Sequence, residues 1–172
     1  NLKSLIKFSK KNDSPISIDF VISNNLKAKG LNYAKLYKIK KKILNFKNQN
    51  LSENKLLYIL KTNNIEMICL AGFMKILSKN FIKKFKGKIL NIHPSLLPKY
   101  KGLNTHERAL NNKEKYSGCT VHFVNSRLDS GKIILQKKVK ISKKETVDSL
   151  SKKILVQEHK LYPKAILKIF SL

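Results

Sequence analysis

Acidic residues and arginine are both scarce in this sequence. The 172 residues contain 10 Asp and Glu against 37 Lys and Arg, which gives a formal net charge of +27. Arginine occurs only at Arg108 and Arg127, so the other basic residues are all lysines. Nucleic-acid recognition favours the planar guanidinium of arginine, whereas these lysines are spread over almost every segment. We therefore expect no nucleic-acid partner, although the charge would attract small anions.

Long apolar runs are also missing. No stretch approaches the roughly 18–20 residues that are needed to span a bilayer, so we expect no membrane contact. No secretory signal is visible. The two cysteines, Cys69 and Cys119, stand inside apolar stretches and lack the spacing of metal ligands. We predict that both are reduced and buried, as in a cytoplasmic protein.

The pattern that is present alternates between strands and helices. Apolar periodicity predicts strands over 16–23, 38–44, 66–73, 88–93, 117–124 and 132–141, with 66–73 buried on both faces. It predicts helices over 2–9, 52–64, 78–85, 105–112 and 146–170, and a short one between 24 and 39. The alternation predicts an α/β fold with a doubly wound, mostly parallel sheet. No helix separates the last two strands, so we expect a late antiparallel pair.

Three local signals bear on the helix ends. Ser52 is the expected N-cap of the helix over 52–64. Ser142 and Glu145 have the spacing of a capping box before the last helix. Pro163 lies inside that last helix, and we expect it to kink or divide the helix, because proline removes a hydrogen bond and clashes with the preceding turn.

Asn91 and His93 are polar residues at the end of an otherwise apolar strand. The stretch ILNIHPSLLPKYKG (89–102) places them two residues apart, so both side chains lie on one face of the predicted strand. The chain then leaves the sheet in a loop between Pro94 and Pro98, at the edge where open α/β sheets bind ligands. A structural role at the strand end is the alternative, and catalysis would need a third polar group beside the imidazole.

Asp129 is the candidate for that third group. It stands in FVNSRLDSGKIIL, in a predicted turn between two strong strands. Asp and Gly are also ordinary turn residues, which is the structural alternative. A turn that follows one strand can lie over the end of another strand, and this would bring the Asp129 carboxylate to the His93 ring.

Glu158 falls on the apolar stripe of the last predicted helix, one turn after Ile154. A carboxylate on an inward face is costly unless it is paired or binds a cation. A ligand ammonium is one explanation, and a stripe edge that reaches solvent is the other. We interpret His122 and His159 as structural residues and leave His106 unassigned.

These segments together resemble the glycinamide ribonucleotide formyltransferases, a folate-dependent family of purine synthesis. The resemblance is carried, in this order, by AGFMKILS (71–78), NIHPSLLPKYKG (91–102), LDSGKIILQ (128–136) and VQEHKLYP (156–163). It implies a Rossmann-like fold and transfer of the formyl group of 10-formyltetrahydrofolate to the primary amine of glycinamide ribonucleotide. It also implies a cytoplasmic enzyme that needs no metal.

The resemblance further implies the site residues. The family's catalytic Asn, His and Asp fall on Asn91, His93 and Asp129. The folate side falls on Asn91 and on two segments: Met74, Lys75, Ile76 and Leu77, and Asn125, Ser126, Arg127, Leu128 and Asp129. The glycinamide side falls on Asn1, Leu155, Val156, Gln157 and Glu158. In this chemistry Asn91 and a protonated His93 would stabilise an oxyanion, Asp129 would favour the charged ring, and Glu158 would hold the substrate amine.

The family pattern is incomplete at the N-terminal end. Its glycine-rich phosphate loop runs into the first helix at a Ser-Asn-Leu sequence, which Asn1-Leu2 resembles. We therefore expect residues 1–172 to be a single formyltransferase domain that lacks the first strand and most of the phosphate loop. Methionyl-tRNA formyltransferases and formyltetrahydrofolate deformylases share the Asn-x-His element and the later Asp, and they are the alternatives. A basic nucleic-acid-binding module without catalysis is a third. The oligomeric state stays open.

Overall fold

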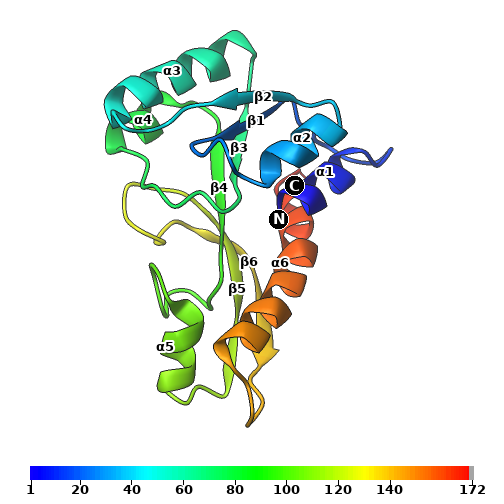
Figure 1. The fold of residues 1–172 in the computed structure, drawn as a ribbon, viewed down its shortest axis with the longest axis vertical. Coiled ribbons are helices and arrows are strands. Elements are labelled where there is room, and N and C mark those ends of the chain that lie inside the picture. Colours follow the sequence, from blue (N-terminus) through cyan, green and yellow to red (C-terminus); the bar gives the residue numbers. More distant parts are fainter. Residues whose placement is uncertain (171–172) are drawn as a thin grey trace. The chain divides into compact units, whose positions relative to one another are not determined.

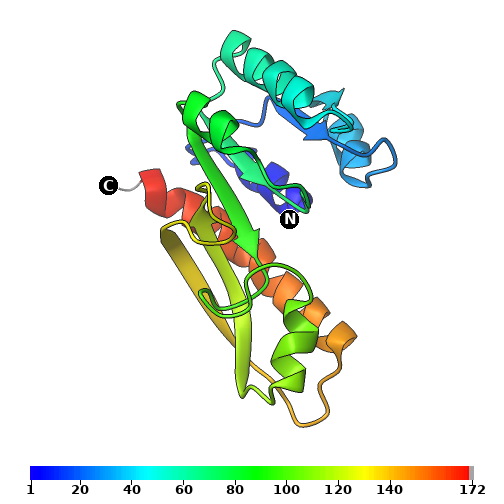
Figure 2. The ribbon, with the colours of Figure 1, turned by 90° about the vertical axis from the view of Figure 1, so that its left-hand side faces the viewer.

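Helices and strands alternate along the chain as the sequence pattern predicts. A computed structural model describes residues 1–170 (Figures 1 and 2). By internal contacts the chain divides into an N-terminal unit, Leu2–Lys88, and a C-terminal unit that contains Asn1 and the residues from Ile89 on. The prediction of a single domain stays a prediction.

The N-terminal unit is built around a parallel pair of strands. It contains α1 (Leu2–Ser9), β1 (Phe20–Ser23), α2 (Gly30–Leu36), β2 (Lys40–Ile43), α3 (Gln49–Thr62), β3 (Met67–Leu70) and α4 (Lys79–Lys84). The parallel register runs from Phe20 opposite Lys40 to Ser23 opposite Ile43. β1 is shorter than the predicted strand over 16–23, because its partner begins only at Lys40. Lys38, two residues earlier, has a left-handed φ of 55° that cannot continue a strand.

Two expectations for this unit are wrong in detail. α3 begins at Gln49, because Asn48 rather than Ser52 is its N-cap and accepts a hydrogen bond from the Leu51 amide at 3.0 Å. Asparagine caps helices as well as serine does. β3 is half-buried along its whole length rather than fully buried, and its residue Cys69 is therefore only partly buried, whereas Cys119 is fully buried as predicted.

The C-terminal unit consists of antiparallel strands covered by a long helix. Its elements are β4 (Lys88–His93, which begins at the last residue of the N-terminal unit), α5 (Thr105–Asn111), β5 (Tyr116–Phe123), β6 (Ile133–Lys140) and α6 (Val147–Phe170). β5 is antiparallel both to β6, as predicted, and to β4, so the antiparallel part is larger than expected. α6 packs along β5 and β6 (Figure 2).

The long helix differs from prediction at two points. Its cap is formed by Thr146 and Ser149, whose hydroxyls accept from each other's backbone amides at 2.9 and 3.1 Å. Ser142 and Glu145 do bond to each other, but they precede the helix and do not form its box. Pro163 does not divide α6, which is continuous from Val147 to Phe170. The α/β class is confirmed, with parallel strands early and antiparallel strands late.

Candidate active site

Asn91 and His93 lie on one face of β4, as their spacing predicts. The antiparallel register places Asn91 opposite His122 and His93 opposite Thr120 on β5. Directly opposed residues of antiparallel strands have their side chains on the same face. β5 therefore adds a second imidazole beside the two residues that the sequence predicted.

His93 has a hydrogen-bond acceptor at each ring nitrogen. Its Nε2 lies 2.8 Å from the Tyr100 carbonyl oxygen, and its Nδ1 lies 3.4 Å from Asp129 Oδ2, with the two side chains 7% and 9% exposed. Each ring nitrogen of His93 thus faces an oxygen atom.

Asp129 reaches this position from the loop between β5 and β6. Its backbone adopts a left-handed φ of 43°, a conformation that Asp tolerates better than most residues. Its Oδ2 accepts a hydrogen bond from the Gly102 amide at 2.9 Å, and its Oδ1 lies 3.7 Å from His122 Nε2. The predicted approach of residue 129 to the His93 ring is thus present in the fold.

His122 fixes the orientation of the Asn91 amide. Its Nδ1 donates to the Phe123 carbonyl at 2.8 Å, so its Nε2 is free to accept, and Asn91 Nδ2 lies 3.4 Å from it. Burial lowers the pKa of His122, against the opposing effects of the Phe123 carbonyl and Asp129. A neutral ring suits the acceptor role. Sequence analysis gave His122 only a structural role, because nothing in the sequence fixes which β5 residue opposes Asn91.

Glu158 is buried on the inner face of α6, where the periodicity placed it. Its Oε2 accepts a hydrogen bond from Asn1 Nδ2 at 2.6 Å, so the two residues predicted for the glycinamide side do meet. Burial raises the pKa of Glu158, although the Asn1 bond and the nearby His93 act in the opposite direction. Leu155 and Val156, in the turn that precedes Glu158, are exposed.

Comparison with known proteins identifies the family of this chain. The family model described as formyl transferase matches residues 1–166. The chain belongs to this family. It is 41% identical to the phosphoribosylglycinamide formyltransferase of Haemophilus influenzae over 169 residues, which cover 96% of this chain and 80% of that protein. It is 43% identical to the human trifunctional purine biosynthetic protein adenosine-3, but it spans only 17% of that protein's length.

Solved formyltransferase structures share the fold. The crystal structure of phosphoribosylglycinamide formyltransferase from Anaplasma phagocytophilum superposes with a TM-score of 0.90 at 41% identity, covering 96% of this chain and 78% of that one. The enzyme from Bacillus halodurans gives a TM-score of 0.92 at 31% identity, covering 98% of this chain and 89% of that one. The Rossmann-like formyltransferase fold that the motifs implied is thereby confirmed.

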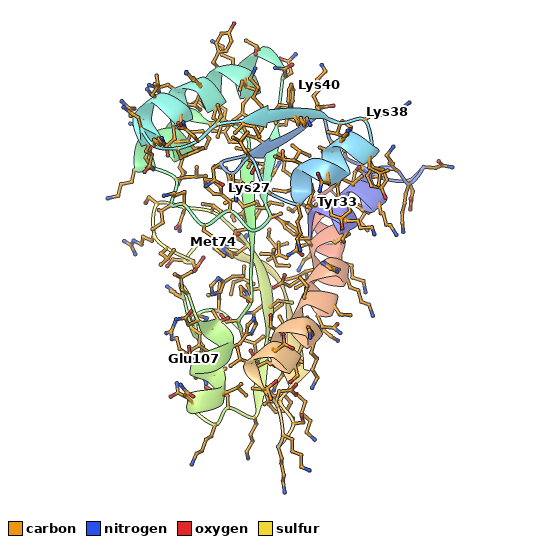
Figure 3. All side chains as sticks on the ribbon, viewed as in Figure 1. Lys27, Tyr33, Lys38, Lys40, Met74 and Glu107 are labelled. Atoms are coloured by element: carbon orange, nitrogen blue, oxygen red, sulfur yellow. The ribbon has the colours of Figure 1, made fainter. Side chains whose placement is uncertain are left out.

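The two segments predicted to contact folate lie in different units. Asn125 to Leu128 form an exposed loop before Asp129, in which Asn125 Oδ1 accepts from the Arg127 amide at 2.9 Å. Met74 to Leu77 form an irregular segment of the N-terminal unit; Met74 and Ile76 are exposed, whereas Leu77 is buried (Figure 3 labels Met74). The folate contacts of both segments stay predictions.

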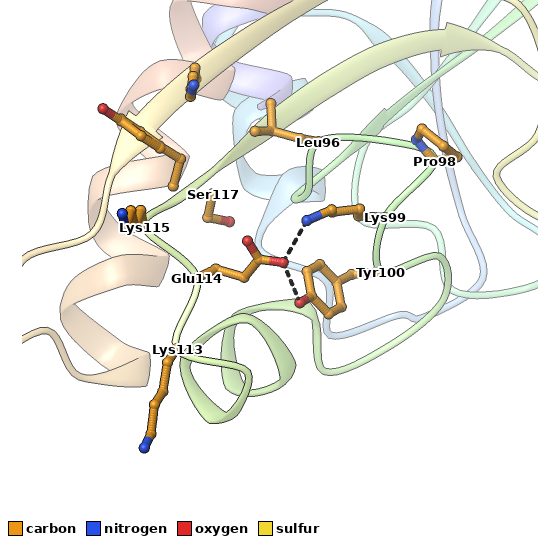
Figure 4. A pocket seen from close by; sticks show the side chains of 10 residues that line it. Leu96, Pro98, Lys99, Tyr100, Lys113, Glu114, Lys115 and Ser117 are labelled. Atoms are coloured by element: carbon orange, nitrogen blue, oxygen red, sulfur yellow. Dashed lines mark hydrogen bonds and ion pairs between the residues drawn. The ribbon is translucent and has the colours of Figure 1, made fainter.

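Hydrogen bonds to Glu114 anchor the outer side of the loop that carries Tyr100. A surface pocket of about 520 Å³ lies beside this loop. Within it, Glu114 accepts from Lys99 Nζ at 2.7 Å and from the Tyr100 hydroxyl at 2.8 Å (Figure 4). On the inner side, the buried Thr120 hydroxyl accepts from the Leu97 amide at 3.1 Å. These contacts hold in place the backbone whose Tyr100 carbonyl meets His93.

No cluster of metal-binding side chains occurs within residues 1–170. Over the same residues, none of the helices combines the length and the apolar character that crossing a bilayer requires. The buried Nδ1 of His106 has no hydrogen-bond partner, and burial lowers the pKa of this ring; the structure gives it no role.

Proposed function

We propose that this protein transfers the formyl group of 10-formyltetrahydrofolate to the primary amine of glycinamide ribonucleotide. The observation that carries the proposal is the position of Asp129 beside the buried ring of His93, on the face of β4 that also carries Asn91, in a chain of the formyl transferase family. The relatives named phosphoribosylglycinamide formyltransferase support this substrate. We place the reaction in the cytoplasm, in de novo purine synthesis.

The reaction needs stabilisation of negative charge on the formyl oxygen. When the amine attacks the formyl carbon, that oxygen becomes an oxyanion. Asn91 Nδ2 carries two hydrogens, of which His122 Nε2 accepts one, so the other can bond to the oxyanion. A protonated His93, with Asp129 at its Nδ1 and the Tyr100 carbonyl at its Nε2, would place a positive charge beside the same atom.

Collapse of the tetrahedral intermediate requires a proton shift. The attacking nitrogen must lose a proton, and the folate nitrogen that leaves must gain one. We assign this transfer to His93 or to a water molecule that it orders. The groups that act on the reacting atoms are thus an amide, an imidazole and the carboxylate that holds the imidazole. No step requires a resident metal ion.

Glu158 supports binding of the amine substrate in this proposal. Its carboxylate is almost fully buried and its hydrogen bond comes from the neutral Asn1 side chain. A glycinamide amine or amide N–H group would supply the additional donor that a buried carboxylate needs. The assignment explains why a glutamate interrupts the apolar stripe of α6. Leu155, Val156 and Gln157 line the same turn, and we propose them as the remaining glycinamide contacts.

A direct assay tests the proposal. The purified complete protein should convert 10-formyltetrahydrofolate to tetrahydrofolate only in the presence of glycinamide ribonucleotide, followed by folate absorbance. Methionyl-tRNA should neither be formylated nor compete. Formylation of methionyl-tRNA would establish a tRNA formyltransferase instead, and release of formate without any acceptor would establish a deformylase. Salt-sensitive binding to any polyanion without turnover would favour the nucleic-acid-binding alternative.

A further inference from the structure

Glu53 is a buried carboxylate in the N-terminal unit. The residue is 4% exposed and lies on the inner face of α3. Within residues 1–170 it forms no ion pair with a lysine or an arginine. In a chain with 37 basic and 10 acidic residues, a buried acid without a cation beside it is unusual. Its hydrogen bonds must therefore compensate for the loss of hydration.

Every hydrogen bond that Glu53 accepts comes from Ser78 or from Gln49. Glu53 Oε1 accepts from the Ser78 amide at 2.8 Å and from Gln49 Nε2 at 2.9 Å, and Oε2 accepts from the Ser78 hydroxyl. Gln49 Nε2 also donates to the Ile76 carbonyl at 2.8 Å. Two side chains on adjacent turns of α3 thus hold the backbone at residues 76 and 78.

The segment is anchored on both sides of these bonds. Ser78 is the N-cap of α4, and its hydroxyl accepts from the Phe81 amide at 3.0 Å. At the other end, the Phe73 ring packs edge-on against Phe46, with centroids 5.3 Å apart. The backbone from residue 73 to residue 78 is irregular, so no helix or strand hydrogen bonds fix its conformation. Side-chain contacts fix it instead.

Apart from Lys75, the side chains that this segment exposes between residues 74 and 77 are apolar. Met74 is 77% exposed and Ile76 is 64% exposed, whereas Leu77, between Ile76 and Ser78, is buried at 6%. These two side chains provide apolar surface that a bound ligand would cover. The resemblance to the formyltransferases implies that this segment contacts the folate, and the identity of that ligand rests on the proposed formyl transfer.

We propose that Glu53, acting through Gln49 and Ser78, is a positioning residue that fixes segment 74–78 in its folate-binding conformation. Glu53 does not touch the folate in this proposal. It holds the Ser78 amide directly and the Ile76 carbonyl through Gln49. Preorganisation of the segment lowers the entropy that folate binding would otherwise cost, so the clamp sets folate affinity and leaves the chemical step unchanged.

The two acceptor oxygens of Glu53 make a graded test possible. In Glu53→Gln, the amide oxygen can keep the bonds from Gln49 and the Ser78 amide, and the new NH2 can donate to the Ser78 hydroxyl oxygen. Glu53→Ala removes all three acceptor contacts and leaves the Ser78 amide without its partner. Comparison of these two variants separates the effect of losing the hydrogen bonds from the effect of losing the negative charge. Asn54→Ala, at an exposed position of the same helix, is the matched control.

The experiment measures tetrahydrofolate binding by calorimetry, the Michaelis constant for each substrate, kcat, and the melting temperature of each variant. Glu53→Ala should raise the Kd for tetrahydrofolate and the KM for the formyl donor about tenfold, the scale of one lost charge-assisted hydrogen bond. The kcat and the KM for glycinamide ribonucleotide should stay within about twofold. Glu53→Gln should stay within about threefold of wild type throughout, and Asn54→Ala should be unchanged.

Gln49→Ala extends the test to a milder change. It should raise the Kd for tetrahydrofolate about threefold, because solvent can partly replace the bond to the Ile76 carbonyl. If Gln49 acts only through the clamp, Gln49→Ala should add little to Glu53→Ala in the double variant. If Glu53→Ala does not fold, Gln49→Ala and Ser78→Ala test the inference in its place. Unchanged folate affinity in both of these variants overturns the inference.

Failure of the inference is distinguishable from failure of the proposed function. An active wild type whose Glu53→Ala variant keeps its folate affinity, or loses it only in proportion to a lower folded fraction, contradicts the positioning role. A wild type that binds no tetrahydrofolate and transfers no formyl group contradicts the proposed function itself. The wild-type titration is therefore performed first.

Discussion

Replacing Asp129 with asparagine isolates the charge of the proposed catalytic cluster. Asp129 Oδ2 accepts from the Gly102 amide at 2.9 Å and faces His93 Nδ1 at 3.4 Å. In Asp129→Asn the amide oxygen can keep the Gly102 bond, and the NH2 group would face the acceptor nitrogen of His122. The substitution therefore removes the negative charge beside the His93 ring and leaves each neighbouring group with a partner.

The size of the effect follows from the distance. Two unit charges 3.4 Å apart interact by about 5 kcal/mol at an effective dielectric constant of about 20. Both side chains are less than a tenth exposed, so solvent screens the pair only weakly. If roughly half of this energy, about 2.5 kcal/mol, is expressed in the transition state, kcat falls by a factor of ~10². That factor agrees with the usual loss for an acid–base or oxyanion-stabilising group.

The assay is steady-state formyl transfer followed by folate absorbance, with the melting temperature of each variant measured in parallel. We expect the KM for both substrates to stay within about threefold of wild type, because the carboxylate acts on the ring and not on either ligand. Asp148→Asn is the control: it removes a carboxylate that is 76% exposed and paired with Lys152 on α6, and it should not change kcat. A folded Asp129→Asn protein with kcat within threefold of wild type would refute the electrostatic role of Asp129.

Four further substitutions test the same cluster and two other parts of the molecule. His93→Ala and Asp129→Ala should each lower the kcat of the folded protein by at least ~10², and normal turnover in either variant would remove that residue from the catalytic set. Glu158→Gln should raise the KM for glycinamide ribonucleotide about tenfold. Because burial raises the pKa of Glu158, the wild-type KM should fall as rising pH ionises this carboxyl, a trend that the Gln variant should lack; an identical pH profile would contradict the assignment. Hydrogen bonds from Ser149, Lys153 and Ser142 lower the pKa of Glu145 to about 2, so its contribution to stability is present above its ordinary pKa and is lost as pH falls toward 2. Glu145→Gln should lower the melting temperature at neutral pH by about 2–4 °C, and a difference that persisted undiminished near pH 2 would argue against this account.

The helix boundaries show what local sequence can and cannot decide. Ser78 stands at the start of the helix predicted over 78–85, and it is the N-cap of α4. At α3 and α6 several residues could cap, and the chain uses Asn48 and Thr146 rather than Ser52 and Ser142. Neighbouring Ser, Thr and Asn residues have similar capping strength, so the packing of the following helix selects among them. Pro163 likewise lies within a helix that packing against β5 and β6 keeps continuous.

The sequence alone determined the α/β class, the order of the elements, the two residues on one face of β4 and the carboxylate on the stripe of α6, because these features depend on periodicity along one segment. Only the tertiary structure decided that β5 is antiparallel to β4, that His122 therefore stands beside Asn91 and Asp129, and that Glu53 clamps the segment from Met74 to Ser78. Pairing register and contacts between distant segments depend on how whole elements pack, and a pattern within one segment carries no record of its partner.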